Sequence, residues 1–328
     1  MQYKSKLDLL ETEIAIKFVK DEFEKQLAKT LNLTRVSAPL FVEPSTGLND
    51  NLNGVERAVK FDIADLKKEY EIVQSLAKWK RNALHKYGFT EGSGLYTDMN
   101  AIRRDETLDS IHSAYVDQWD WEKIINVKDR KIGYLKKTVK RIYGAIKKTA
   151  LKVNAKFPQV KSDLPDEITF ISTNELEKEY PDLTRKQREN AAAKKYGAIF
   201  VYRIGWDLKD KQPHDGRAAD YDDWKLNGDI VLYYDVLDMA FEVSSMGIRV
   251  DEVSLVKQLK KRKELYKLDN PYCQDIINKR LPLTIGGGIG QSRLCMFLLK
   301  KAHIGEVQAS AWSDEDIKKN AEKGIFLL

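Results

Sequence analysis

The chain opens with apolar residues spaced three and four positions apart, which is the period of an amphipathic helix. The repeat consists of Ile14, Phe18, Val19, Phe23, Leu27 and Leu31. It predicts a helix of about twenty residues that ends near Asn32. Residues 34–42 are β-branched and apolar around Pro39, and because proline cannot donate to a sheet, we expect a strand at an edge or an interface there. Residues 43–56 are rich in turn formers and predict a loop large enough to reach over a site.

A second helix is predicted between Val73 and Tyr87, and it carries a lysine on its apolar face. Lys80 is in phase with Leu76 and Leu84. One interpretation is that the lysine stem lies along apolar surface while its ammonium group reaches solvent. The other is that the ammonium group faces a buried anion. The pattern alone leaves both open.

The segment around residues 115–122 alternates between apolar and polar side chains, as a strand with one packed face does. Trp119 and Trp121 belong to one face, whereas Gln118 and Asp120 share the other. Two further strands are predicted at residues 229–234 and 240–250, with a short turn between them, as an antiparallel pair.

The last predicted strand places Glu242 and Ser244 on one face. Arg249 is out of phase by one residue, and a bulge at Gly247 would return it to that face. Asp229, on the neighbouring strand, is a plausible second carboxylate beside Glu242. Such hard oxygens suit Mg²⁺, which takes one or two protein carboxylates together with substrate phosphates. The alternative is a pair of ordinary surface carboxylates.

An acidic cluster precedes these two strands at residues 214–224, where Asp220, Asp222 and Asp223 stand close together on an apparent loop. Carboxylates this close repel one another unless a cation or an ammonium ligand lies among them. A solvated acidic turn is the competing interpretation.

Residues 281–299 combine a short apolar strand, a glycine cluster and an apolar helix with Arg293 in its first turn. Gly286, Gly287, Gly288 and Gly290 allow a ligand to approach the backbone closely, and a helix N-terminus with an arginine favours a phosphate. A glycine-rich turn before a core helix is the alternative. The segment is neither a P-loop nor a complete dinucleotide-binding fingerprint.

Composition narrows the class of protein. The chain has 328 residues, 42% of them hydrophobic and 32% charged, with a mean hydropathy of −0.50. A net charge of +6 from 56 basic and 50 acidic residues is small, so a nucleic-acid surface is not expected. No apolar run approaches membrane-spanning length, so a membrane partner is not expected either. Two cysteines and four scattered histidines give no zinc spacing and no disulfide framework. We therefore expect a cytoplasmic protein with a single domain spanning residues 1–328.

Several motifs in this order resemble the ammonia-dependent asparagine synthetase (aspartate-ammonia ligase) family over nearly the whole chain. They are DNLNG at 50–54, SLAKWKR at 75–81, GLYTD at 94–98, YVDQWDWE at 115–122, DYDDW at 220–224, LNGD at 226–229, FE at 241–242, SSMGIRV at 244–250 and the glycine motif. The resemblance implies an α+β fold like that of class II aminoacyl-tRNA synthetases, an antiparallel sheet flanked by helices. It also implies a homodimer, with the first helix and the Pro39 segment at the interface.

The resemblance implies that ATP and aspartate form a β-aspartyl-adenylate, which ammonia converts to asparagine and AMP. Arg103 and Arg293 are similar to the motif 2 and motif 3 arginines that hold the nucleotide, although the neighbouring Arg104 makes the first assignment ambiguous. Arg249, Gly288 and Gly290 are expected at the nucleotide, and Mg²⁺ at Asp229 and Glu242. The residues expected to bind aspartate are Asp50, Lys80, Gln118, Asp120, Asp222 or Asp223, Ser244 and Ser245.

Three other functions are compatible with parts of this pattern. An aspartyl-tRNA synthetase paralogue shares the activation chemistry, but the first helix begins too early for its usual N-terminal anticodon-binding domain. A glutamine-dependent asparagine synthetase normally has a cysteine after the initiator methionine, where this chain has Gln2. A silent regulator that binds an amino acid and a nucleotide is the third. Asp50 and Asp120 are both candidates for the base that deprotonates ammonium.

Overall fold

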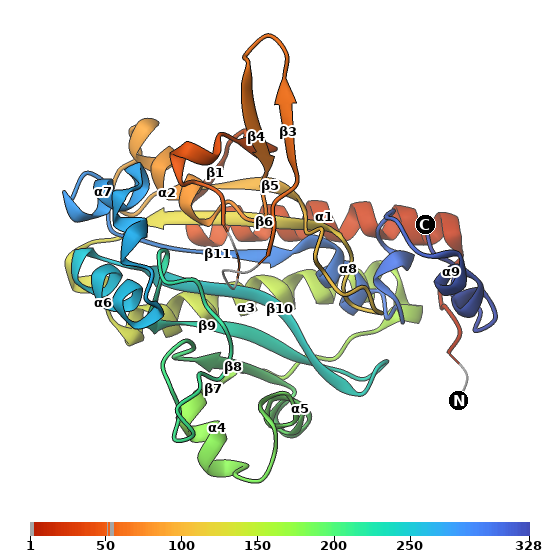
Figure 1. Cartoon of the computed structure of the whole chain (residues 1–328). Coiled ribbons are helices and arrows are strands. Elements are labelled where there is room, and N and C mark those ends of the chain that lie inside the picture. Colours follow the sequence, from red (N-terminus) through yellow and green to blue (C-terminus); the bar gives the residue numbers. More distant parts are fainter. Residues whose placement is uncertain (1–2, 51, 53–55) are drawn as a thin grey trace.

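A computed structural model describes residues 3–50, 52 and 56–328. Its centre is an eight-stranded sheet with the order β1-β5-β6-β11-β10-β9-β8-β7, and a three-stranded sheet with the order β2-β4-β3 lies apart from it (Figure 1). The strands are β1 (Leu33–Arg35), β2 (Phe41–Val42), β3 (Lys60–Ile63), β4 (Lys68–Ile72), β5 (Gly94–Ile102), β6 (Tyr115–Ile124), β7 (Thr169–Ser172), β8 (Ala198–Tyr202), β9 (Asp222–Tyr234), β10 (Met239–Arg249) and β11 (Thr284–Gly290).

Only the outer strand pairs of the large sheet, β1 with β5 and β7 with β8, are parallel. The α-helices are α1 (Leu9–Leu31), α2 (Ala77–Lys86), α3 (Ile132–Lys156), α4 (Thr173–Glu179), α5 (Arg185–Tyr196), α6 (Glu252–Arg262), α7 (Pro271–Ile277), α8 (Gln291–Leu298) and α9 (Asp314–Ala321). Single 3₁₀ turns are η1 (Pro44–Thr46), η2 (Val127–Asp129), η3 (Pro158–Val160), η4 (Leu265–Asp269) and η5 (Ile304–Glu306). The expected α+β class is confirmed.

The back of the sheet is covered by α1 and α3, which pack on each other and enclose the main core. α1 begins with a capping box between Asp8 and Glu11 and ends at Asn32, whose φ of 60° is left-handed. Trp119 is fully buried against Phe23 of α1, with 4.8 Å between ring centroids. The predicted first helix and the two-residue alternation of β6 are thus confirmed.

The segment 34–42 is not one strand, and that prediction was wrong. β1 pairs with β5 in the large sheet, whereas β2 pairs with β4 in the small one. Pro39 lies between them, outside both strands. Proline removes a ladder donor and restricts the residue before it, so the chain leaves one sheet there and enters another. The loop predicted at 43–56 contains residues 51 and 53–55, which lie outside the described part of the chain.

The glycine cluster was expected between a short strand and a helix, but its glycines are part of the strand itself, since β11 runs from Thr284 to Gly290. β11 pairs with β6 on one side and with β10 on the other, in the middle of the large sheet. The helix predicted after it is α8. The acidic segment was likewise assigned to a loop, but β9 already begins at Asp222.

The pairing of β10 with β9 is irregular at two positions, and one of them is the expected position at Gly247. Register shifts between Glu242 and Ser244, where Val243 has no partner on β9. Glu242 therefore shares a face with Ser245 rather than with Ser244. The register with β9 shifts again between Gly247 and Arg249, where the bulge was expected, and Arg249 lies at the cavity beside Asp222.

Several elements were not predicted, among them the β3–β4 hairpin and the outer strands β7 and β8. Figure 1 shows the hairpin projecting from the body of the molecule, with α4 and α5 beside β7 and β8 at the opposite edge. The search for membrane-spanning helices covered the described residues and found none with both the length and the apolar character required.

Candidate active site

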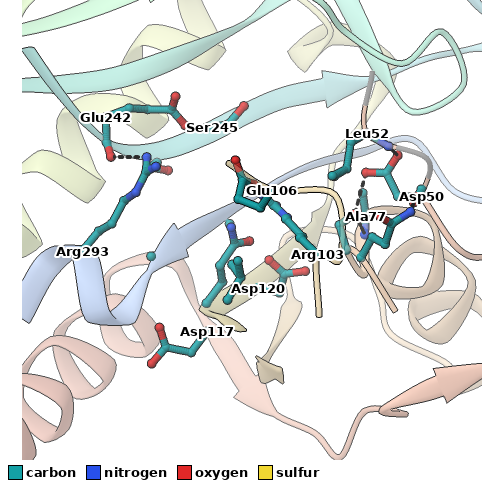
Figure 2. Close-up of a pocket in the computed structure, with 18 of the residues that line it drawn as sticks. Asp50, Leu52, Ala77, Arg103, Glu106, Asp117, Asp120, Glu242, Ser245 and Arg293 are labelled. Carbon is teal, nitrogen blue, oxygen red and sulfur yellow. Dashed lines mark hydrogen bonds and ion pairs between the residues drawn. The ribbon is translucent and has the colours of Figure 1, made fainter. Parts of the chain in front are cut away.

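A cavity of about 420 Å³ lies over the front of the sheet, on the face opposite α1 and α3. It brings together residues from β6, β10, β11, α2, α8 and several loops (Figure 2). The predicted site residues that line it are Asp50, Lys80, Arg103, Gln118, Asp120, Asp222, Glu242, Ser244, Ser245, Arg249, Gly288, Gly290 and Arg293. Asp223 and Asp229 are not among the lining residues.

The glycines of β11 make the cavity floor thin. In the sheet register, Gly288 stands between Asp120 of β6 and Ser245 of β10. A Cβ atom on Gly288 would come within 2.6 Å of the Asp120 carboxylate, and one on Gly286 would overlap the Glu122 carboxylate. Any larger side chain would therefore occupy space that these acidic side chains now fill. The glycines were expected to let a ligand approach the backbone, whereas in the structure they leave room for protein carboxylates.

Arg249 forms a buried charge cluster with two carboxylates. Its guanidinium donates to Glu122 at 2.7–3.1 Å and to Asp222 at 2.6 Å. Burial opposes the charged form of Arg249, yet Glu122 and Asp222 raise its pKa. All three of its nitrogens therefore have protein partners. Arg249 lies at the cavity as expected for a nucleotide ligand, but its donors already hold the floor together.

Lys80 points into the protein and is 1% exposed, so the interpretation in which it reaches solvent was wrong. Its Nζ donates to the carbonyl oxygen of Gly287 at 2.9 Å and lies 3.3 Å from Asp120 Oδ2. Burial lowers its pKa, while Asp120 opposes that shift. Asp120 also accepts from the backbone N–H of Leu76, so the buried ion pair of Lys80 and Asp120 is held in a fixed position at the cavity.

Asp50 reaches the cavity from the loop before β3. Its carboxylate accepts hydrogen bonds from the Ser75 hydroxyl at 2.8 Å and from the backbone N–H of Leu52 at 2.9 Å (Figure 2). Burial raises its pKa, although Lys78 opposes this shift. Within the described residues no salt bridge neutralises Asp50, in contrast to Asp120 and Asp222. It is therefore an anion placed to accept a cationic ligand.

Arg293 enters the cavity from the first turn of α8. Its Nη1 donates to the backbone carbonyl of Glu242 at 3.0 Å (Figure 2). The helix starts after Gly290, which provides no side-chain cap. Asp117 of β6 replaces that cap, because its carboxylate accepts from the N–H and the hydroxyl of Ser292. The arginine is thus held by backbone contacts and keeps donors for a ligand.

Arg103 and Arg104 follow β5 and take different directions. Arg103 lines the cavity, and its nearest acidic partner, Glu106, is 3.9 Å away. Its Nε is buried without a hydrogen-bond partner. Arg104 is exposed and does not line the cavity. The cavity therefore contains two guanidinium groups, those of Arg103 and Arg293, that donate no hydrogen bond to a carboxylate in the described residues.

Comparison with known proteins agrees with this geometry. A family model described as aspartate-ammonia ligase matches residues 10–324. The chain belongs to the aspartate-ammonia ligase family. It is 61% identical over 328 residues to the aspartate–ammonia ligase of Fusobacterium nucleatum, which covers 100% of both chains. It is 58% identical over 332 residues to that of Clostridium perfringens, covering 99% of this chain and 97% of the relative.

Solved structures show the fold. Asparaginyl-tRNA synthetase from Pyrococcus horikoshii, complexed with asparaginyl-adenylate, superposes with a TM-score of 0.65 at 15% identity, covering 90% of this chain and 68% of that one. Aspartyl-tRNA synthetase from Entamoeba histolytica gives 0.60 at 13% identity, covering 90% and 58%. The class II synthetase-like fold expected from the sequence is confirmed.

The expected magnesium ligands of this family member lie on neighbouring strands. Asp229 is opposite Ser245, on the face that carries Glu242. Burial, together with Glu242, raises the pKa of Asp229 to about 8, while Arg217 opposes the shift. Asp229 Oδ1 is buried without a hydrogen-bond partner. No group of three or more His, Cys, Asp or Glu side chains suited to a metal occurs in the described chain. Two carboxylates, one with an unsatisfied oxygen, fit a Mg²⁺ ion whose other ligands come from phosphates.

Two residues of the acidic segment lie elsewhere. Asp223 forms an ion pair with Arg130 at 2.7 Å, and Asp220 pairs with Lys78 at 3.1 Å. Of the alternatives Asp222 and Asp223, the structure thus places Asp222 at the cavity. The alternation along β9 sends adjacent side chains to opposite faces, which explains the difference.

Other residues that line the cavity of this aspartate-ammonia ligase family member were not predicted from the sequence. They include Ser75, Asp117, Arg217, Ser292 and Gln308. Asp117 stands in the same motif as Gln118 and Asp120, but its phase assigned it to the packed face. Arg217 was visible as a lone cation among the acids of residues 214–224, and this charge pattern was the available signal.

Proposed function

We propose that the chain ligates ammonia to the β-carboxylate of aspartate through a β-aspartyl-adenylate, with ATP as co-substrate and AMP and pyrophosphate as products. Ligation of ammonia to aspartate is the activity of the family to which the chain belongs. The observation that supports the adenylate route is the pair Arg103 and Arg293, two guanidinium groups in one cavity that donate no hydrogen bond to a carboxylate of the described residues.

The first step brings a carboxylate toward a phosphorus atom surrounded by anionic oxygens. Arg103 and Arg293 would pair with the α-phosphate and offset the growing negative charge. Because their donors are held in place before the substrates arrive, little reorganisation is needed; one such donor contributes about 3–4 kcal/mol in comparable sites. The carboxylate oxygen bonds to the α-phosphorus while the bond to the β-phosphate oxygen breaks.

Glu242 and Asp229 would hold Mg²⁺, which supplies further charge compensation at the phosphates when bound. Glu242 faces the cavity, and the unsatisfied oxygen of Asp229 lies behind it. Ser245 stands between Asp229 and Gly288 in the sheet register. The protein itself contributes two anionic ligands here and leaves the remaining positions to the substrate.

Aspartate would bind above the floor formed by β6 and β11. Lys80 pairs with its carboxylates, and Gln118, Ser244 and Ser245 surround the substrate chain. Asp120 fixes Lys80 from behind. Asp222 is already paired with Arg249, so Asp50 is the anion that remains for an ammonium group. We assign Arg249 to positioning Asp222 and Glu122 rather than to the nucleotide.

In the second step ammonia attacks the acyl carbon and AMP leaves. Ammonium predominates near neutral pH, so a base has to remove a proton first. Of the two candidates, Asp120 is held by Lys80 and the Leu76 N–H, whereas Asp50 forms no salt bridge within the described chain and has a raised pKa. We therefore assign the base to Asp50.

We infer a homodimer from the apolar residues exposed on the first elements of the chain. Leu10 of α1 is 70% exposed, and Leu9 and Ile14 beside it are 51% exposed. Leu40 and Phe41, in the segment that joins the two sheets, are exposed as well. Leu9, Leu10 and Ile14 lie together at the start of α1, and exposed apolar side chains grouped in this way are typical of a protein interface. Light scattering at several protein concentrations tests this: a monomer at all of them contradicts it.

Product analysis tests the proposed reaction. Purified protein is incubated with ATP, aspartate and ammonium, with glutamine or tRNA as parallel nitrogen donor or acceptor. We expect asparagine together with AMP and pyrophosphate, in equal amounts, only when ammonium is present. ADP as the product would contradict the adenylate route. Aspartyl-tRNA would favour a synthetase, and nucleotide binding without turnover would favour a regulator.

A further inference from the structure

Arg217 is a buried cation at the active cavity to which the reaction above gives no role. It lies on the segment between β8 and β9, lines the cavity and has a side chain that is 13% exposed. Its Nη2 pairs with Asp229 Oδ2, and its Nη1 donates to Asp215 Oδ2 at 2.7 Å and to the Gly216 carbonyl at 2.9 Å. Its Nε is buried without a partner.

Arg217 lies among three carboxylates. Two of them, Asp229 and Asp215, accept from its guanidinium, and the third, Glu242, lines the same cavity. Arg293 contacts the same part of β10, through the backbone carbonyl of Glu242. Two guanidinium groups from different elements thus approach Glu242, which is the residue expected at the phosphates.

The present partners of Arg217 are ones that a bound nucleotide would replace. Asp215 is 58% exposed, and an ion pair with so exposed a carboxylate contributes little. Asp229 is a proposed magnesium ligand, so a divalent cation would take over the neutralisation that Arg217 now provides. A guanidinium released from Asp229 beside a triphosphate has a planar set of donors that fits phosphate oxygens in pairs.

We propose that Arg217 binds the β- and γ-phosphates of ATP and the pyrophosphate that leaves, exchanging its contact with Asp229 for these phosphates. This inference rests on the proposed adenylate chemistry. When the oxygen of the aspartate carboxylate bonds to the α-phosphorus, the electron pair of the broken P–O bond leaves with pyrophosphate. Arg217 pairs with that charge, whereas Arg103 and Arg293 serve the α-phosphate, which remains in the adenylate.

The test compares ligands that contain the outer phosphates with one that lacks them. Calorimetry measures the binding of α,β-methylene-ATP, pyrophosphate and AMP, each with Mg²⁺, to the wild type, Arg217→Met and Arg217→Lys. We expect Arg217→Met to weaken the first two ligands at least about tenfold and AMP less than about twofold. Arg217→Lys should lie between, because it keeps the charge and loses the planar donors.

Asp215→Asn is the matched control, since it removes the exposed partner of Arg217 and leaves the guanidinium. It should bind pyrophosphate as tightly as the wild type or more tightly. Weakening of AMP by Arg217→Met to the same degree as pyrophosphate would show a structural role only and overturn the inference. Unchanged pyrophosphate binding in Arg217→Met would overturn it too.

A separate assay distinguishes this inference from the proposed function. Aspartate-dependent exchange of labelled pyrophosphate into ATP is measured with the wild-type protein. Absence of exchange in the wild type contradicts the adenylate route itself. Exchange in the wild type, with unaltered pyrophosphate binding in Arg217→Met, contradicts only the role of Arg217.

Discussion

The carboxylate of Asp117 caps the helix that carries Arg293, through Ser292. Asp117 accepts from the Ser292 backbone N–H at 3.0 Å and from the Ser292 hydroxyl at 2.8 Å. The same carboxylate forms an ion pair with Lys20 of α1 at 3.0 Å and accepts from Gln308 at 3.2 Å. A residue of β6 therefore fixes where α8 begins, and through it the position of a guanidinium group in the cavity.

Replacing Asp117 should impair the use of ATP more than that of aspartate. In Asp117→Ala the first turn of α8 loses its cap, which costs about 1–2 kcal/mol of stability. Displacement of Arg293 should lower kcat/KM for ATP on the order of ten- to a hundredfold. Steady-state kinetics and urea denaturation measure the two effects. Lys20→Met is the control, because it removes the ion pair but keeps the cap; an equal kinetic loss in Lys20→Met would refute the capping explanation.

Lys80→Met should abolish recognition of aspartate. We expect kcat/KM for aspartate to fall at least about a hundredfold, because the substrate carboxylates lose their buried cation. The substitution also leaves Asp120 unpaired, which alone costs about 3–5 kcal/mol of stability. The double variant Lys80→Met with Asp120→Asn separates these effects: it should regain stability but not aspartate turnover. Recovery of both would mean that Lys80 only balances Asp120.

The glycines of β11 give a prediction about stability. Gly286→Ala places a methyl group on the Glu122 carboxylate and near Arg249, so we expect it to lower the free energy of unfolding by about 1–3 kcal/mol or more. Gly133→Ala, at an exposed position in α3 with nothing near the added methyl group, should be neutral or stabilising by up to about 1 kcal/mol. Urea denaturation measures both. Equal midpoints would contradict the close packing described here.

The assignment of Asp50 as base predicts a dependence on pH. Because burial raises the pKa of Asp50, the carboxylate that accepts the proton is lost at higher pH than for an ordinary aspartate. The rate with ammonium should fall as pH drops through that pKa. The pH–rate profile of Asp50→Asn should lack this acidic decrease. Hydroxylamine, which is mostly unprotonated near neutral pH, needs no such base, so Asp50→Asn should slow the reaction with hydroxylamine less than the reaction with ammonium. An equal loss with both nucleophiles would leave Asp50 only its contact with the ammonium group of aspartate and would contradict its role as the base.

The sequence predicted best those features that depend on a local period. Alternation along residues 115–122 was enough to place Gln118 and Asp120 on the side opposite Trp119, because the two-residue period of a strand holds in any tertiary context. The three- and four-residue repeat of α1 worked for the same reason. The family motifs identified most of the predicted cavity residues, because each motif is several residues long and contains residues from the same site.

The sequence failed where a residue's role is set by a neighbour distant in the chain. Gly286 is small because Glu122 needs its space, and nothing near position 286 shows this. The bulge at Val243 exists only in relation to β9, so the face shared by Glu242 and Ser245 was not predictable from β10 alone. Arg249 was expected at the nucleotide. Its actual partners, Asp222 and Glu122, lie 27 and 127 positions away in the chain, so no local pattern pointed to them.

Oxygen transfer from aspartate to AMP tests the central claim most directly. Aspartate labelled with ¹⁸O in its β-carboxylate is converted with ATP and ammonium, and the products are analysed by mass spectrometry. Attack of that carboxylate on the α-phosphorus leaves one labelled oxygen on the phosphate of AMP, and this is the predicted result. Unlabelled AMP, or label in inorganic phosphate, would contradict the proposed β-aspartyl-adenylate.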